Sequence, residues 1–133
     1  MFKNAYQLIR DILDDDTLNN YILDETGKHL AVINAGAKIS APCVSILLNG
    51  GSYSRKSNSG AEVDFLVSFA LPFWGAKAFI QCLDFVDLIL PVFFDYRGNR
   101  DFVLRASPSI QELDAEGSQL WAVNFILTVA TYF

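Results

Sequence analysis

The sequence predicts an α+β protein whose elements follow the order helix, hairpin, helix, hairpin. Three observations carry this prediction. Apolar residues near the N-terminus recur at helical spacing, two later segments alternate at the period of a strand, and the period becomes helical again after Pro72. The 133 residues match a common domain size and contain no repeat or linker, so we expect a single domain over residues 1–133.

The N-terminal segment is expected to be a helix from Asn4 to Asp14, with Asn4 as its cap. Its apolar residues form one stripe, made of Tyr6, Ile9, Ile12 and Leu13. The acidic run 14–16 lies where negative charge is unfavourable to the helix dipole, so it is interpreted as a solvated turn. Thr17 is the expected N-cap of a short second helical turn that ends near Ile22.

The first hairpin is preceded by a segment, residues 23–38, whose pattern is weak. It contains a turn signal at 25–28, a possible short strand over 29–34 and a loop at 35–37. Strands are then expected over 39–48, where Pro42 indicates an edge position or a bulge, and over 62–71. The Gly/Ser-rich stretch 50–60 between them is expected to be the loop of an extended hairpin.

A long helix is expected from Trp74 to Leu90, with Pro91 ending it. It is apolar around most of its circumference, which indicates burial against its own sheet and against a neighbouring subunit. Asp84 and Asp87 near its middle argue against a membrane span. Trp74 at its start is expected to lie in the core.

The last part of the chain predicts a second hairpin. After a polar turn at 96–100 and a short strand at 102–105, residues 107–109 are expected to break the chain. Strands follow over 110–116 and 120–131, with Gly117 and Ser118 at the turn. Both faces of the last strand are largely apolar, which is typical of a central or interface strand.

Charge and composition exclude several function classes. The formal net charge is −5, which disfavours sequence-specific nucleic-acid binding by a basic surface and disfavours contact with anionic membranes. The N-terminus does not resemble a signal peptide, so a cytosolic origin is expected. Cys43 and Cys82 are then expected to be buried, reduced thiols.

No pattern in the sequence predicts catalysis, a metal site or a cofactor. The segment 50–57 has the spacing of a phosphate-binding loop, but Arg55 stands where the second glycine is required. His29 is the only histidine and has no evident partner for nucleophilic catalysis. The cysteines lack zinc-ligand spacing, and the acidic run lacks calcium-loop spacing. The pair Asp84 and Asp87 is interpreted as part of a solvent-facing or interface stripe, so we expect no enzyme activity.

Contact with partner proteins is the remaining role for several polar and aromatic side chains. Long loops on a rigid sheet often carry contacts, and aromatic bulk at a chain end favours docking. The candidates are Tyr53, Arg55 and Lys56 in the Gly/Ser-rich loop, Arg97 and Arg100 in the polar turn, and Tyr132 and Phe133 at the end of the sequence.

The layout resembles the tail-terminator and tail-completion proteins of long-tailed phages. The likeness is carried by the opening helix around residues 6–13, the hairpin 43–71 with its loop, and the closing strand 121–131. It implies a mixed, mostly antiparallel sheet with helices packed on one face. It also implies a hexameric ring that caps the tail tube and contacts the head-side connector, as part of a virion tail or neck assembled in the host cytoplasm.

Three alternatives stay open from the residues alone. Another neck or baseplate subunit would share the same small fold. A ligand- or protein-binding module would need convergent polar groups, for which Ser68 and Asn124 on apolar strands are the candidates. A small enzyme would have to act through Asp84, Asp87 or His29.

Overall fold

A five-stranded mixed sheet is the centre of the molecule. The computed structural model describes residues 2–34, 36–53, 61–95, 102–115 and 118–131. The strands are β1 (Ala31–Ile33), β2 (Cys43–Tyr53), β3 (Ala61–Leu71), β4 (Phe102–Ala115) and β5 (Ser118–Thr131), in the spatial order β1-β2-β3-β5-β4. Only β1 and β2 are parallel, while the other neighbouring pairs are antiparallel. The α+β class and the mostly antiparallel sheet are confirmed.

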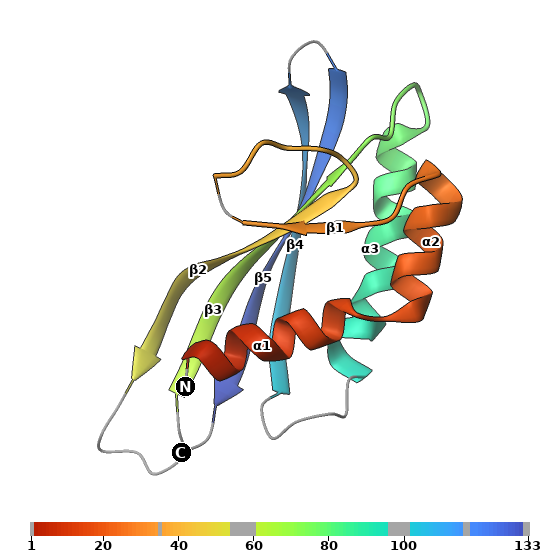
Figure 1. Ribbon diagram of the computed structural model, residues 1–133. Helices are drawn as coiled ribbons and strands as arrows, with labels where there is room; N and C mark the ends of the chain where they lie inside the picture. Colours follow the sequence, from red (N-terminus) through yellow and green to blue (C-terminus); the bar gives the residue numbers. More distant parts are fainter. Residues whose placement is uncertain (1, 35, 54–60, 96–101, 116–117, 132–133) are drawn as a thin grey trace.

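Three helices cover one face of this sheet: α1 (Phe2–Leu13), α2 (Asp16–Thr26) and α3 (Ala78–Asp95) (Figure 1). The side chains at alternate positions of β3 and β5 point toward them and are almost completely buried. Helix α1 packs on β3 and β5, and α3 packs on β4 and β5 with α2 beside it. The opposite face, which we call the open face, has no helix on it among the described residues (Figure 1).

Aromatic rings form the centre of the core. Phe69 of β3 contacts Phe85 of α3 with ring centroids 4.9 Å apart, and Phe125 of β5 lies 5.1 Å from Phe93 of α3. All four side chains are fully buried. Such edge-on and tilted pairs add stability beyond the burial of their area, so this cluster joins α3 firmly to the sheet.

The second helix differs from its expected form. It has 11 residues, and its N-cap is Asp15, whose Oδ2 accepts a hydrogen bond from the backbone N–H of Leu18 at 2.9 Å. Thr17 is therefore inside the helix, and the acidic run is part of a cap as well as a turn. The helix ends at Gly27, which adopts the left-handed conformation (φ 74°) and donates its N–H to the carbonyl of Leu23. Helix α1 likewise begins before Asn4, which is not its cap.

Two prolines lie inside elements that the sequence predicted they would end. Helix α3 continues past Pro91 to Asp95, and this last turn carries Phe93 into the core. Strand β4 runs without a break through Pro108, which is exposed. β4 is the outermost strand of the described sheet, and edge strands are where a sheet tolerates proline.

Candidate interaction surfaces

The open face is organised in rows of side chains that lie opposite one another across the strands. A polar row crosses four strands, because Ser45 pairs with Ser68, Ser68 with Asn124, and Asn124 with Ser109. The next row is apolar on three strands and consists of Leu47, Leu66 and Ile126. Leu47 and Ile126 are exposed, so an apolar strip lies beside the polar row.

A hollow of about 290 Å³ is centred on the polar row. Its lining includes Ser45, Ser68, Asn124 and Gln111, and its apolar wall includes Ile33 and Ile39 from β1 and the segment after it. None of the side chains that line it is charged. The structure thus brings Ser68 and Asn124 together, as a binding module would require. The sequence did not identify Ser45 or Gln111, because only the strand register places them beside the other two.

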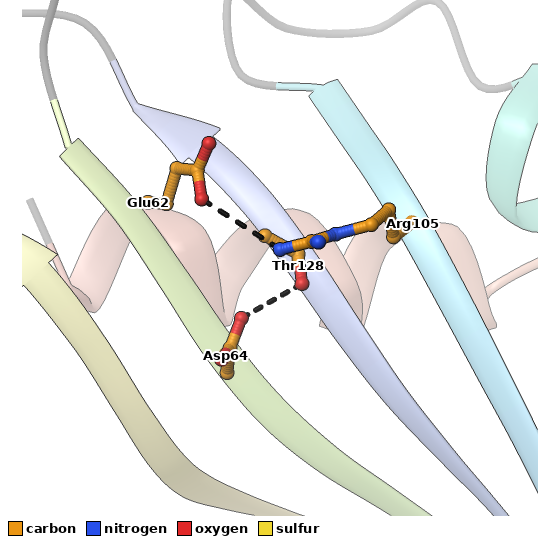
Figure 2. Close-up of polar contacts among 4 residues, drawn as sticks. All are labelled: Glu62, Asp64, Arg105 and Thr128. Atoms are coloured by element: carbon orange, nitrogen blue, oxygen red, sulfur yellow. Dashed lines mark hydrogen bonds and ion pairs between the residues drawn. The ribbon is translucent and has the colours of Figure 1, made fainter.

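The far end of the open face is charged. Thr128 of β5 is almost fully buried and donates its hydroxyl hydrogen to Asp64 Oδ1 of β3 at 2.7 Å. Beside it, Arg105 Nη2 of β4 lies 3.8 Å from Glu62 Oε2 of β3. Figure 2 shows these side chains in front of the sheet, with a helix behind it. The open face therefore changes from an uncharged hollow at one end to ionic groups at the other.

Four exposed large apolar side chains lie on α3 and in the segment just before it. We call this set the α3 patch, and it consists of Trp74, Phe79, Ile80 and Leu83. Trp74 is 77% exposed and Ile80 is 58% exposed. The expectation that Trp74 lies in the core was wrong, because the chain turns away from the sheet after Phe73, which is buried in its place. Exposed apolar groups in one patch are typical of a contact surface.

The residues considered for catalysis lie on two different parts of the fold. His29 is exposed and lies between α2 and β1, and Asp84 and Asp87 are exposed on α3. Among the residues that the structure describes, no three His, Cys, Asp or Glu side chains form a group that could hold a metal ion. Gly50 and Gly51 belong to β2, so the start of the phosphate-loop-like segment is strand.

Most of the predicted contact residues lie outside the described ranges. This applies to Arg55, Lys56, Arg97, Arg100, Tyr132 and Phe133. The backbone of Tyr53 is described and pairs with Ala61 at the end of the first hairpin. The structure therefore leaves these contacts as predictions.

Both cysteines are free and buried, as expected. Burial raises the pKa of the Cys82 thiol from 9.0 to about 11. Burial also raises the pKa of Cys43, against the lowering effect of backbone hydrogen bonds at Ser40 and Ala70. The pKa of Tyr21 is raised by burial first and then by the nearby carboxylates of Glu25 and Asp84. Both thiols are therefore protonated and unreactive near neutral pH.

None of the helices in the described part of the chain has the length and apolarity needed to cross a membrane.

The chain resembles a protein of known structure in its fold. No protein-family model matches the chain, and no curated protein matches it. Among solved structures, a chain from the virion of a native gene transfer agent particle is similar, at a TM-score of 0.49 and 17% sequence identity. The alignment covers 94% of this chain and 89% of that chain. A likeness at this TM-score carries no conclusion about what the present chain does.

Proposed function

We propose that this chain is a structural subunit that binds other protein subunits and has no catalytic role. The more specific role is a phage tail terminator, a homohexameric ring that caps the tail tube and joins it to the head-side connector. Such a subunit belongs to the tail or neck of a virion and is assembled in the host cytoplasm. Support comes from the sequence resemblance and from the exposed α3 patch, not from the likeness to the gene transfer agent chain.

The α3 patch is the observation that carries this proposal. The inner side of α3 is packed into the core through Phe85, Ile89 and Phe93. Phe79, Ile80 and Leu83 on the same helix are exposed, beside the exposed carboxylates of Asp84 and Asp87. Apolar side chains outside the buried stripe of a helix favour a second contact. Covering these side chains with another subunit removes their apolar area from water, at roughly 25 cal/mol per Å².

The sheet edges offer a second route to association. In the described sheet β4 has only β5 as a neighbour, and β2 beyond Ser45 has only β3. Unpaired edge groups can accept a strand from another chain. Pro108 has no backbone N–H, so the row of hydrogen-bond donors along β4 is interrupted there. An added strand could therefore pair with β4 only over a limited length.

The first test is the native mass of the purified protein, together with negative-stain images of the same sample. We expect closed rings of six. The variant Ile80→Glu places a charge in the α3 patch and is expected to abolish the rings without unfolding the subunit. Asn20→Glu, which adds the same charge at an exposed position of α2, is the matched control and is expected to keep them.

Two results would count against this role. One is a protein that stays monomeric up to about millimolar concentration, where even contacts of about 4 kcal/mol are populated. The other is loss of rings in Asn20→Glu as well as in Ile80→Glu, which would show that any added charge prevents association. A ring that binds neither tail-tube nor connector protein would instead favour another neck or baseplate subunit.

A ligand-binding module is the second candidate, and the hollow on the open face favours it. The hollow combines apolar walls with Ser68 and Asn124, which face each other across β3 and β5. Small-molecule sites have this composition. If the chain is a ligand-binding module, we expect a monomeric protein whose melting temperature rises when neutral amides or alcohols are added. We expect Ser68→Leu to remove that rise. Rings that form without any ligand argue against it.

A further inference from the structure

The chemistry of the hollow restricts what it can hold. Its lining carries hydroxyl and amide groups but no charge, so an ionic ligand would lose its hydration without gaining a partner. Its volume of about 290 Å³ is the volume that roughly ten water molecules occupy in the liquid. This volume lies just below the range of typical ligand pockets. A single large, uncharged side chain that carries a hydrogen-bond donor therefore fits it better than a drug-sized molecule.

Trp74 has the properties that the hollow requires. Among the described residues it is the most exposed of the large apolar side chains, at 77%, and it precedes α3 by a few residues. Its indole is bulky and uncharged and carries one N–H donor, for which the oxygens of Ser68 and Asn124 are acceptors. Tryptophan is also one of the residue types enriched among dominant contact residues at protein interfaces.

The distribution of charge favours a contact between copies at the hollow and at Trp74. Each copy carries a formal net charge of −5, so two copies repel each other over most orientations. The charged end of the open face, with Glu62 and Asp64, would add to that repulsion. The hollow and Trp74 are uncharged, and joining them buries no like-charged pair.

The two features lie close together on each copy. Trp74 follows β3 by a few residues, and Ala70 near the end of β3 lines the hollow. The two features are therefore at the same end of the subunit and no more than about 14 Å apart along the chain. They are different surfaces, so in the proposed ring each copy gives its Trp74 to one neighbour and its hollow to the other. A reciprocal two-fold pair of copies would use the same two surfaces but stop at a dimer, so the native mass distinguishes the two arrangements.

We propose that the hollow on the open face receives Trp74 of a second copy of this chain. This assignment rests on the proposed ring, since it names the residues through which neighbouring subunits bind. It predicts that Trp74 is exposed in the single subunit and enclosed in the ring.

Tryptophan fluorescence tests the assignment directly. Trp121→Phe leaves Trp74 as the single indole of the chain. Trp121 Nε1 is buried without a hydrogen-bond partner among the described residues, so phenylalanine removes an unpaired donor and keeps an aromatic ring near Phe79. Ring formation by this variant is checked by its native mass. We expect the emission of Trp74 to move to shorter wavelength, and its quenching by acrylamide to fall, as the protein concentration is raised and rings form.

Two variants test the two sides of the contact. Trp74→Ala is expected to weaken association about 30-fold or more, which corresponds to about 2 kcal/mol. Ser68→Leu places a larger side chain in the hollow and is expected to weaken association between copies by a similar factor. Ser107→Leu, the same change on the open face but outside the lining, is the matched control and is expected to keep the rings.

The outcomes separate this assignment from the proposed function. Rings in which Trp74 keeps a long-wavelength, readily quenched emission would overturn the assignment and leave the ring subunit in place. Loss of rings in Ser68→Leu but not in Trp74→Ala would also overturn it, because another group would then occupy the hollow. A wild-type protein that forms no ring under any condition would refute the proposed function itself.

Discussion

At the scale of single residues, the buried thiols link stability to pH. The fold raises the pKa of Cys82 from 9.0 to about 11, so over this window the unfolded chain releases a proton that the folded chain retains. The unfolded state is thereby favoured, and the free energy of unfolding is expected to fall as pH rises from about 9 to about 11. At about 1.4 kcal/mol per pKa unit, the loss over the two units is on the order of 3 kcal/mol.

Urea denaturation at pH 8 and at pH 10.5 measures this effect. Cys82→Ala is the informative variant, because it should lose most of the dependence, while the smaller contributions of Cys43 and Tyr21 remain. If the variant and the wild type decline equally with pH, ionisation of Cys82 is not responsible.

The two polar contacts in Figure 2 are expected to differ in strength. Thr128 is buried and donates to the carboxylate of Asp64, so Thr128→Val is expected to destabilise the protein by about 1–2 kcal/mol. Arg105 and Glu62 are 69% and 51% exposed, and solvent screens their attraction. Arg105→Gln is therefore expected to cost less than about 0.5 kcal/mol. Equal losses in thermal or urea unfolding would contradict this ranking.

At the scale of elements, the cap of α2 provides a matched pair of variants. Asp15 accepts from the N–H of Leu18, and Asp15→Ala is expected to lower stability by about 1 kcal/mol. Asp14 is exposed and follows the C-terminal end of α1, where a negative charge is unfavourable. Asp14→Ala is therefore expected to be neutral or slightly stabilising. Chemical denaturation of both variants checks the assignment, and a larger loss in Asp14→Ala would show it to be wrong.

Periodicity predicted the existence of most elements but not all of their limits. The alternation of residues 62–71 and 121–129 is a local pattern, and it correctly separated inward from outward side chains. The course of the chain at Pro91 and Pro108 depends on tertiary context instead. The helix turn after Pro91 is stabilised by the burial of Phe93, and Pro108 lies on an edge strand of the described sheet. Neither condition can be seen in the residues next to the proline.

The surfaces were harder to predict than the elements. The hollow requires the register of β2, β3, β5 and β4, which brings Ser45 and Gln111 beside Ser68 and Asn124 from distant parts of the chain. The apolar character of α3 predicts a contact with a neighbouring subunit, and this stays a prediction. The exposure of Trp74, in contrast, depends on where the chain leaves β3, and no local pattern signals it.

At the scale of the whole molecule, the net charge is expected to control assembly. Copies with a formal charge of −5 repel each other, and salt screens this repulsion. The Debye length falls from about 30 Å at 0.01 M to about 8 Å at 0.15 M ionic strength. If apolar contacts hold the ring together, the fraction of protein in rings should rise over this range. Light scattering or native mass across a salt series measures it, and a fall would indicate that ion pairs dominate the contact.

The place of β5 in the sheet also determines when the subunit can fold during its synthesis. It is the last of the five strands to leave the ribosome, yet it lies between β3 and β4. Until it emerges, β4 lacks its only neighbour in the described sheet, and the core lacks Phe125 and Leu127. Asn124, which lines the hollow, is made in the same last stretch. Nascent chains on one messenger RNA therefore cannot associate through the hollow until β5 of each chain has been synthesised.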